Sequence, residues 1–341
     1  MLIGNFLAYK GVTSPTEEIA RHLKASGWKV VYASSKTARL ARLVDMIKTT
    51  WGHRHDYKSA HVDVYSGAAF LWAEIVCRLL RVLGKPFTLT LHGGNLPAFS
   101  RRWPGRVHNL LQSAVVVTAP SGYLLDQMRP YRQDLLLIPN GLHIQAYRFR
   151  GRTRVSPKLI WLRSFHAMYN PQLAPKVLNL LATEFPDIHL TMVGPDKGDS
   201  SLEKTMRKAQ EMGVADRISF QGQVPKADVP YWMDRGDIFL NTTYIDNMPV
   251  SVIEAMASGL CLVSTDVGGI PYLLEHEKDA LLVPPDDPSA MAAAVRRILT
   301  EPDLAARLSE NARQKAEQFD WSVILPQWEA LVSAVAQGHP A

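Results

Sequence analysis

The chain has 341 residues, of which 47% are hydrophobic and 21% are charged. This length predicts two domains of ordinary size, and the composition is typical of a soluble globular protein. Two cysteines, Cys77 and Cys261, lie far apart, which excludes a disulfide framework and argues against a zinc site. No stretch approaches the roughly 18 uncharged apolar residues of a membrane span, and the first residues resemble a strand rather than a signal peptide. We therefore expect a cytoplasmic protein.

The charge is distributed unevenly along the chain. Residues 1–150 contain 20 Lys/Arg and 8 Asp/Glu, which gives +12, whereas residues 151–341 contain 18 and 24, which gives −6; the sum is the net +6 of the chain. A basic first half predicts an anionic partner: acidic lipid headgroups, an anionic acceptor or nucleic acid. Because no recognition motif or dense basic run is present, nucleic acid is disfavoured.

The first half alternates apolar strands with amphipathic helical segments. Pro15–Ser26 and Thr37–Thr49 are expected as helices. The expected strands are Leu2–Leu7, Lys29–Ala33, His61–Tyr65, Phe87–Leu91, Ala114–Thr118 and Leu135–Ile138. Gly141, Gly151 and Pro157 then mark a linker over residues 140–156.

The second half repeats the plan. Its expected strands are Lys158–Leu162, Ile188–Val193, Arg217–Phe220, Asp237–Asn241, Leu260–Ser264 and Ala280–Val283. This alternation predicts an α/β protein with two doubly wound parallel sheets, whose ligands bind outside the carboxyl ends of the strands, in half-sites that face each other across a cleft. We expect domains at 1–150 and 151–319 and a final helical segment, 320–341.

A basic segment of the first half has two interpretations. The helix over Thr37–Thr49 has one apolar face, which is expected to pack on the sheet, and basic residues beside it that are either solvated or in contact with an anionic membrane. The apolar residues are Leu40, Leu43, Val44 and Ile47, and the basic ones are Lys36, Arg39, Arg42 and Lys48. A second cluster is Arg101-Arg102-Trp103-Pro-Gly-Arg106. Membrane contact would make the protein peripheral on the inner face of the membrane.

The most informative stretch runs from Asp246 to Gly259, with Glu254 seven residues beyond the first acid. It reads as a loop and a helix after the strand Asp237–Asn241, with Pro249 at the first helical position and Gly259 at the C′ position. Amide groups at a helix N-terminus attract a diphosphate, and an acidic residue beside it accepts hydrogen bonds from ribose. The alternative is a solvated loop residue followed by a surface helix residue.

The sequence of this stretch resembles the glutamate-x7-glutamate signature of glycosyltransferase family 4, the retaining enzymes of GT-B fold. The resemblance extends, in chain order, to several further segments of both halves. These are Pro139-Asn-Gly141, Val193-Gly194, Phe220-Gln-Gly222 and Ser264-Thr-Asp-Val-Gly-Gly-Ile-Pro271. The resemblance implies that the second domain binds a nucleotide-sugar donor, that the first binds the acceptor, and that the last helix returns to the first domain.

The resemblance also implies roles for single residues. Glu254 would hold the ribose. Arg163, with the helix N-terminus, would bind the diphosphate and stabilise the leaving group. His92 would act near the sugar; the alternative is a strand-end histidine that is bonded only to backbone. Asp246, Arg163 and His92 are the catalytic candidates. The remaining donor-side candidates are Asn247, Met248, Val250, Ser251, Gly222, Val224, His166 and Gly11.

The chain departs from the family pattern at two places. Asp246 replaces the first glutamate, and Asn247-Met248-Pro249 replace Gly-Phe-Gly, so the sugar is held differently. Met168 stands where the family has a phosphate-binding lysine, and His166, Tyr169 or Asn170 could substitute for that lysine.

We therefore expect a retaining glycosyltransferase that moves a sugar from a nucleoside diphosphate donor to an acceptor hydroxyl of a polysaccharide, lipopolysaccharide or glycolipid. No metal or other cofactor is implied, and no pair of carboxylates suits a double displacement. The alternative is a catalytically weak homologue that binds sugar nucleotides. An NAD oxidoreductase is disfavoured, since no Gly-x-Gly-x-x-Gly follows an expected strand.

Overall fold

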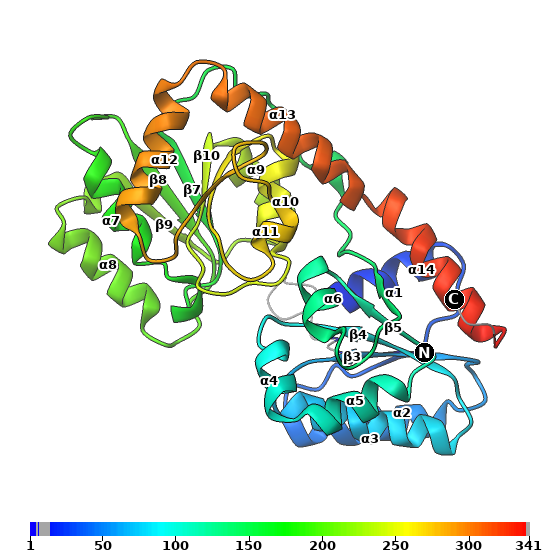
Figure 1. The fold of residues 1–341 in the computed structure, drawn as a ribbon. Helices are drawn as coiled ribbons and strands as arrows, with labels where there is room; N and C mark the ends of the chain where they lie inside the picture. The colour runs from blue at the N-terminus through cyan, green and yellow to red at the C-terminus, as the bar shows by residue number, and fades with distance from the viewer. Residues whose placement is uncertain (5, 7–13, 339–341) are drawn as a thin grey trace. The chain divides into compact units, whose positions relative to one another are not determined.

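A computed structural model describes residues 1–4, 6 and 14–338 of the chain. The chain divides into two compact units, which Figure 1 displays with colours that follow the sequence. Unit 1 comprises Met1–Gly141 and Trp321–Ala341, and unit 2 comprises Leu142–Asp320. Each unit contains its own parallel sheet.

Unit 1 has a six-stranded parallel sheet of order β2-β1-β3-β4-β5-β6. Its strands are β1 Leu2–Ile3, β2 Tyr32–Ala33, β3 Ala60–Val64, β4 Phe87–Leu91, β5 Val116–Ala119 and β6 Leu135–Leu137. All residues of β3, β4 and β5 are buried, because helices cover both faces of such a sheet. The buried residues include the polar His61 and Asp63 of β3. The chain reverses its direction of winding between β1 and β3, because β2 lies on one side of β1 and all later strands lie on the other.

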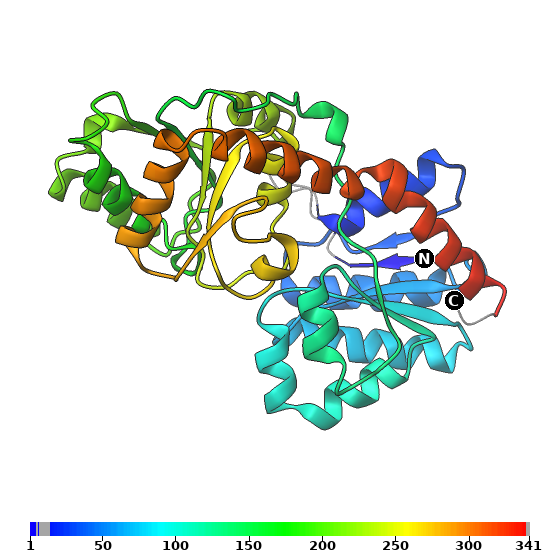
Figure 2. The ribbon, with the colours of Figure 1, turned by 45° about the horizontal axis from the view of Figure 1, so that its top comes forward.

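The helices of unit 1 form two layers, which Figure 2 displays from a second direction. Helices α1 and α14 pack together on one face of the sheet, around Leu23, Ile324 and Trp328. The other face packs on residues of the remaining helices. The helices are α1 Pro15–Ala25, α2 Arg39–Gly52, α3 Ala68–Val82, α4 Leu96–Arg102, α5 Pro104–Gln112, α6 Gly122–Met128 and α14 Trp321–Ala336.

Unit 2 has a six-stranded parallel sheet of order β12-β11-β10-β7-β8-β9. Its strands are β7 Lys158–Leu162, β8 His189–Val193, β9 Ile218–Gly222, β10 Ile238–Asn241, β11 Cys261–Thr265 and β12 Leu281–Val283. Strands β7 to β9 wind outward to one side, and β10 then returns to pair with the other edge of β7. The β7/β10 pair is therefore the topological switch point, where a crevice forms outside the carboxyl ends of the strands.

The helices of unit 2 also cover both faces of its sheet. One hydrophobic cluster joins the sheet to α7, α8, α12 and the start of α13, and a second joins it to α9, α10, α11 and the end of α13. These helices are α7 Leu173–Leu181, α8 Ser201–Glu211, α9 Val229–Asp234, α10 Val250–Ala257, α11 Ile270–Leu273, α12 Pro288–Thr300 and α13 Leu304–Ala316. Short 3-10 turns, such as Lys226–Asp228, connect several of them.

The boundary between the units differs from the expected one. Unit 2 begins at Leu142 rather than at residue 151, and the expected linker is largely part of its packing. Arg152 is fully buried and contacts Asp237 at 3.2 Å, and Arg150 contacts the same carboxylate at 2.7 Å. Two arginines on one buried carboxylate hold this segment against β10, an interaction that linker composition does not reveal.

The orientation of α2 also differs from the expected one. We expected Leu40 and Val44 to pack on the sheet, but they are 79% and 48% exposed, whereas Met46 and Thr50 of the same helix are buried. The inward face therefore includes Met46 and the polar Thr50, which a count of apolar positions leaves out. Among the residues that the structure describes, no helix is long and apolar enough to cross a membrane.

Candidate functional site

The end of β7 places Arg163 at the switch point of unit 2. The Arg163 N–H donates to the Val193 carbonyl at 3.1 Å, which continues the β7/β8 ladder by one residue. Gly194 follows Val193 and lies against Arg163: a Cβ at Gly194 would be 1.8 Å from the Arg163 carbonyl oxygen. This close approach requires glycine and fixes the backbone from which the guanidinium extends.

The guanidinium of Arg163 forms an ion pair with the carboxylate of Asp246, which lies in the loop after β10. It also stacks over the Tyr169 ring, 4.4 Å from the ring centroid. Burial lowers the pKa of Arg163, although the charges of neighbouring groups, including Glu254, act against this shift. The Arg163 Nε is buried and has no hydrogen-bond partner among the described residues.

Two glycines hold the Asp246 loop in place. The Gly269 N–H donates to the Asp246 carbonyl at 2.9 Å, and the Asn247 N–H donates to the Asp246 carboxylate at 2.9 Å. A Cβ would be 2.2 Å from the Asp246 carbonyl oxygen at Gly268 and 1.7 Å from the Asn247 carbonyl oxygen at Gly269. Because no side chain fits between these two loops, the Gly-Gly pair determines where Asp246 stands.

Helix α10 begins beside this loop, one residue later than expected. Pro249 is the N-cap, with φ −72° and ψ 117°, and Val250 is the first helical residue; Met248 just before the cap is buried. The Ser251 hydroxyl in the first turn is buried and has no hydrogen-bond partner among the described residues. The helix ends as expected, with Gly259 at φ +71° after the C-cap Ser258. The backbone N–H groups of the first turn of α10 and the Ser251 hydroxyl can together bind an anionic oxygen.

Glu254 is a buried residue rather than a surface one, with 2% of its area exposed. The Tyr147 hydroxyl donates to its carboxylate at 2.8 Å, and Lys226 forms an ion pair with the same oxygen. Burial, reinforced by the Glu254 charge, raises the pKa of Tyr147 far above its ordinary value, so Tyr147 remains a donor. The carboxylate is therefore held by a phenol and an ammonium group that a ribose hydroxyl can replace or join.

Lys226 and Tyr147 are the two site residues that sequence reasoning missed. Lys226 follows Gly222, which ends β9 at φ +65°, and Val224, which packs against the α10 side of the core. The expectation for Gly222 and Val224 concerned a nucleotide base, and it remains untested. Its position two residues beyond the candidate Val224 could have pointed to Lys226. The sequence, however, does not reveal that Lys226 and Glu254 lie close together.

The candidates for replacing the absent lysine have different neighbours. His166 lies 3.8 Å from the Asp199 carboxylate, and the Asn170 amide donates to Asp286 at 3.3 Å. Tyr169 alone of the three contacts Arg163. Met168 contributes its carbonyl, which accepts from the Tyr244 N–H at 2.9 Å. Lys226, from another part of the chain, is the lysine that reaches this cluster.

Unit 1 contains a second polar cluster, around His92 at the end of β4. The His92 N–H donates to the Val64 carbonyl at 2.8 Å, and its Nε2 lies 3.1 Å from the Asp63 carboxylate. The Nε2 of His61 lies 3.6 Å from the same carboxylate, and Tyr65 stacks on His92 with ring centroids 4.8 Å apart. His92 is thus bonded to a side chain rather than only to backbone. Gly11, the other candidate of this unit, lies outside the described residues.

Asp63 is the centre of this cluster. Thr16 donates its hydroxyl to the carboxylate, and Gly4 leaves the space for it: a Cβ at Gly4 would be 2.2 Å from Asp63 Oδ2. Burial acts to raise the pKa of Asp63, but the charges and hydrogen bonds of His92 and His61 hold it far below its usual range. The carboxylate is therefore ionised and orients the His92 ring.

The comparisons with known proteins agree with this architecture. A sucrose-phosphate synthase from Thermosynechococcus elongatus superposes with a TM-score of 0.81 at 19% identity, over 99% of this chain and 98% of that one. HepE from Anabaena, solved in complex with UDP, gives a TM-score of 0.73 at 18% identity, over 95% and 90%. The two doubly wound sheets are those of the GT-B fold, which defines the chain as a GT-B protein.

The sequence comparisons identify the family. Residues 147–315 match the family described as glycosyl transferases group 1. A D-inositol 3-phosphate glycosyltransferase of Streptomyces avermitilis is 23% identical over 95% of this chain and 77% of the relative. Together with the fold, these matches indicate a glycosyltransferase of the family 4 type.

Proposed function

We propose that this enzyme is a retaining glycosyltransferase whose unit 2 binds a nucleoside diphosphate sugar. The observation that carries the proposal is the cluster at the switch point of unit 2, where Arg163 pairs with Asp246 and the buried Glu254 lies within electrostatic reach of Arg163. The guanidinium and the helix N-terminus suit the oxygens of a diphosphate. The buried carboxylate suits the hydroxyls of a ribose.

Each residue has a role in this proposal. Glu254 accepts hydrogen bonds from the ribose hydroxyls. Arg163 and the first turn of α10, with the unpaired Ser251 hydroxyl, bind the diphosphate and stabilise its charge as the leaving group departs. Asp246 and Asn247 orient the sugar. Because the Asp246 carboxylate is already paired with Arg163, it suits orientation better than covalent attack, which supports front-face transfer with retention.

The proposed reaction needs no metal ion. The diphosphate carries a charge that otherwise requires a divalent cation, and here Arg163, Lys226 and the positive end of α10 offset it. Activity in the presence of EDTA tests this part of the proposal, and a loss of activity restored by magnesium or manganese would contradict it.

Uracil is the first base to test, since HepE has been solved with UDP and with UDP-glucose. The acceptor is proposed to bind unit 1, where His92, held by Asp63, acts beside its hydroxyl. Relatives that act on D-inositol 3-phosphate support an acceptor that carries a phosphate, and the setting is the synthesis of a polysaccharide, lipopolysaccharide or glycolipid.

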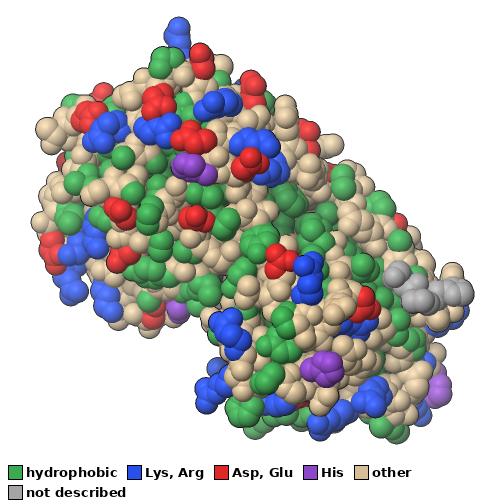
Figure 3. Space-filling view, in the orientation of Figure 1, with side chains coloured by type: hydrophobic (Ala, Val, Ile, Leu, Met, Phe, Trp, Pro, Cys, Tyr) green, Lys and Arg blue, Asp and Glu red, His purple; other side chains and the backbone are tan. Residues whose placement is uncertain are grey.

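A peripheral attachment of unit 1 to the inner face of an anionic membrane is also proposed. Helix α2 exposes Leu40, Val44 and Trp51 next to its basic side chains. Figure 3 displays further basic side chains on the face of unit 1 that it draws. An exposed apolar stripe with flanking cations suits an interfacial helix. This attachment would keep the enzyme cytoplasmic and beside a lipid-linked acceptor.

Thermal unfolding with UDP, GDP, ADP and their sugar conjugates tests the donor site. We expect one nucleoside diphosphate to stabilise the wild type, by about 2.7 kcal/mol when its concentration is about 100 times Kd. Glu254→Gln should lose this effect, and Glu203→Gln, an exposed glutamate of α8, should keep it. If no nucleotide stabilises the wild type, or the two variants respond alike, the donor-site assignment is wrong.

Co-sedimentation with vesicles tests the membrane attachment. The protein should bind vesicles that contain phosphatidylglycerol and should not bind pure phosphatidylcholine vesicles. Leu40→Ser with Val44→Ser should weaken binding, whereas Leu180→Ser, at a leucine of unit 2 that is about as exposed as Val44, should not. Equal binding by both variants would exclude α2 as the contact.

A further inference from the structure

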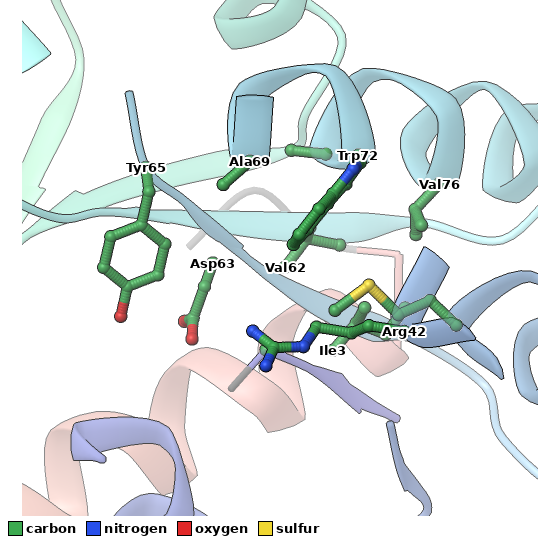
Figure 4. Close-up of a pocket in the computed structure, with 11 residues that line it drawn as sticks. Ile3, Arg42, Val62, Asp63, Tyr65, Ala69, Trp72 and Val76 are labelled. Carbon is green, nitrogen blue, oxygen red and sulfur yellow. The ribbon is translucent and has the colours of Figure 1, made fainter. Parts of the chain in front are cut away.

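A pocket of about 200 Å³ lies in unit 1 between its sheet and helices α2 and α3 (Figure 4). Ile3 and Gly4 at the end of β1 and Asp63 in β3 form part of its wall. These two strands are the pair at which the sheet reverses its winding, and in open parallel sheets ligands bind at such a point. The pocket is therefore in the place where a ligand is expected, and it is separate from the cluster of Arg163 and Glu254 in unit 2.

Most of the pocket is apolar. Its lining residues come from both helices and from the sheet, and Figure 4 displays the Trp72 ring extending from α3 toward the strands. The apolar lining includes Met46, Val62, Trp72, Ala73 and Val76. A cavity of about 150 Å³ with such a lining accommodates benzene. This pocket thus has room for one ring or a short branched chain.

Arg42 introduces a positive charge into this apolar pocket. Its Nε donates to the Lys36 carbonyl at 2.9 Å, and its guanidinium carbon lies 5.8 Å from the centroid of the Trp72 ring. No carboxylate of the described residues lies within 4 Å of the guanidinium. Burial removes part of the hydration of the Arg42 guanidinium and thereby lowers the pKa of Arg42. A partly desolvated guanidinium without a counter-ion favours an anionic ligand.

Asp63, the other charged residue of the pocket, forms no ion pair with Arg42. In Figure 4 the Arg42 guanidinium points toward the Asp63 carboxylate, but the two are not within ion-pair distance. The carboxylate is instead satisfied by His92 at 3.1 Å, by His61 at 3.6 Å and by the Thr16 hydroxyl. The charge that lacks a partner in this pocket is therefore positive.

We propose that this pocket binds a small amphipathic anion, a ring-sized or short-chain apolar group that carries a carboxylate or a phosphate. Arg42 binds the anion, and Trp72 with its apolar neighbours encloses the rest. The assignment of this ligand as a part of the acceptor rests on the proposed function, because Asp63 joins the pocket to His92. The binding itself does not depend on that function.

Phenyl phosphate is a suitable probe because it combines one ring with one phosphate. Its binding to the full-length protein is measured by chemical-shift titration, next to benzyl alcohol, which lacks the charge, and inorganic phosphate, which lacks the ring. We expect phenyl phosphate to bind about tenfold or more tightly than either partial probe, since the pocket offers contacts to both parts.

Matched variants locate the binding. Arg42→Gln should weaken phenyl phosphate about tenfold and leave benzyl alcohol unchanged, whereas Arg39→Gln, an exposed arginine of the same helix, should change neither. Ala69→Leu fills the pocket from α3 and should weaken both ring-containing probes. Thermal melting of each variant verifies that it is folded.

Two further measurements separate this pocket from the donor site. Arg163→Gln and Glu254→Gln should leave phenyl phosphate binding unchanged, and UDP should not displace the probe. If the probe is lost in Arg163→Gln, it occupies the diphosphate site and the pocket proposal is overturned. If inorganic phosphate binds as tightly as phenyl phosphate, or Arg42→Gln binds normally, the proposal fails even when the donor-site assignment holds.

Discussion

Lys226 forms an ion pair with Glu254, although 28 residues separate them and the Glu254 side chain is almost completely buried. Lys226 itself is about half exposed, so its ammonium group reaches inward from the surface to a carboxylate that water hardly contacts. This pairing, with the Tyr147 hydrogen bond, keeps a buried negative charge in place before any nucleotide binds. It also supplies a lysine beside the proposed ribose-binding carboxylate, in a chain that has Met168 where the family has its lysine.

Lys226→Met should destabilise the free protein and weaken nucleotide binding. The buried Glu254 carboxylate would keep only the Tyr147 hydroxyl, and because Lys226 is partly exposed we expect a loss on the order of 1 kcal/mol in the free energy of unfolding. Urea unfolding with and without UDP measures both effects. Lys204→Met, which removes an exposed lysine of α8, is the control; identical behaviour of the two variants would refute a role for Lys226.

Tyr147→Phe should also destabilise the free protein, because the Glu254 carboxylate loses its hydrogen bond from the Tyr147 hydroxyl. The variant removes one hydrogen bond to an ionised, buried acceptor, which corresponds to about 1.5–3 kcal/mol of unfolding free energy. Tyr231→Phe removes the hydroxyl of an exposed tyrosine and should cost almost nothing. Equal unfolding free energies for these two variants would mean that the Glu254 carboxylate finds another partner when the Tyr147 hydroxyl is removed.

Gly269→Ala should reduce transfer activity through the position of Asp246. The added methyl group would be 1.7 Å from the Asn247 carbonyl oxygen, so the loop that carries Asp246 has to move, at a cost of about 1–3 kcal/mol. Gly105→Ala, where a Cβ meets no atom within 4 Å, is the control. The initial rate of sugar transfer is the readout, and an unchanged rate in Gly269→Ala would show that the Asp246 loop need not hold this position.

Arg163→Gln should lower kcat by about 100- to 1,000-fold, the effect of removing one preorganised group that stabilises charge in the transition state. Arg163→Lys keeps the charge but loses the planar contact with Tyr169 and Asp246, and so we expect an intermediate rate. Steady-state kinetics with the nucleotide sugar chosen by the thermal panel measures both. A change in KM alone would assign Arg163 to donor binding rather than to leaving-group stabilisation.

Acid should destabilise unit 1 through Asp63. The pKa of Asp63 is depressed in the folded protein, so its contribution to stability is fully present above the unfolded pKa of about 3.9 and is lost as the pH falls toward the folded pKa. The wild type should therefore lose unfolding free energy more steeply than Asp63→Asn as the pH falls from about 5 through the unfolded pKa of about 3.9 and below it. Parallel pH profiles would show that Asp63 is not held by His61 and His92.

The repeating pattern of strands and helices was readable from the sequence because each buried strand leaves a short apolar run. Most strand positions agree with the expected ones within a few residues, among them Lys158–Leu162 and Phe87–Leu91. The end of α10 at Gly259 was also readable, since left-handed backbone there requires glycine. The prediction of the inward face of α2 was wrong at Leu40 and Val44. The buried Thr50 is polar, and so a search for periodic apolar residues does not find it.

Local periodicity, the positions of glycine and proline, and an ordered series of motifs were enough to predict the two sheets, the family resemblance and the places of Arg163, Asp246 and Glu254 in the chain. The contacts between side chains are visible only in the folded protein. The Arg163–Asp246 pair, the contacts of Lys226 and Tyr147 with Glu254, and the Asp63 cluster with His92 each join residues from different elements. Such distances depend on strand order and helix packing, which arise from the burial of the whole chain and not from neighbours in sequence.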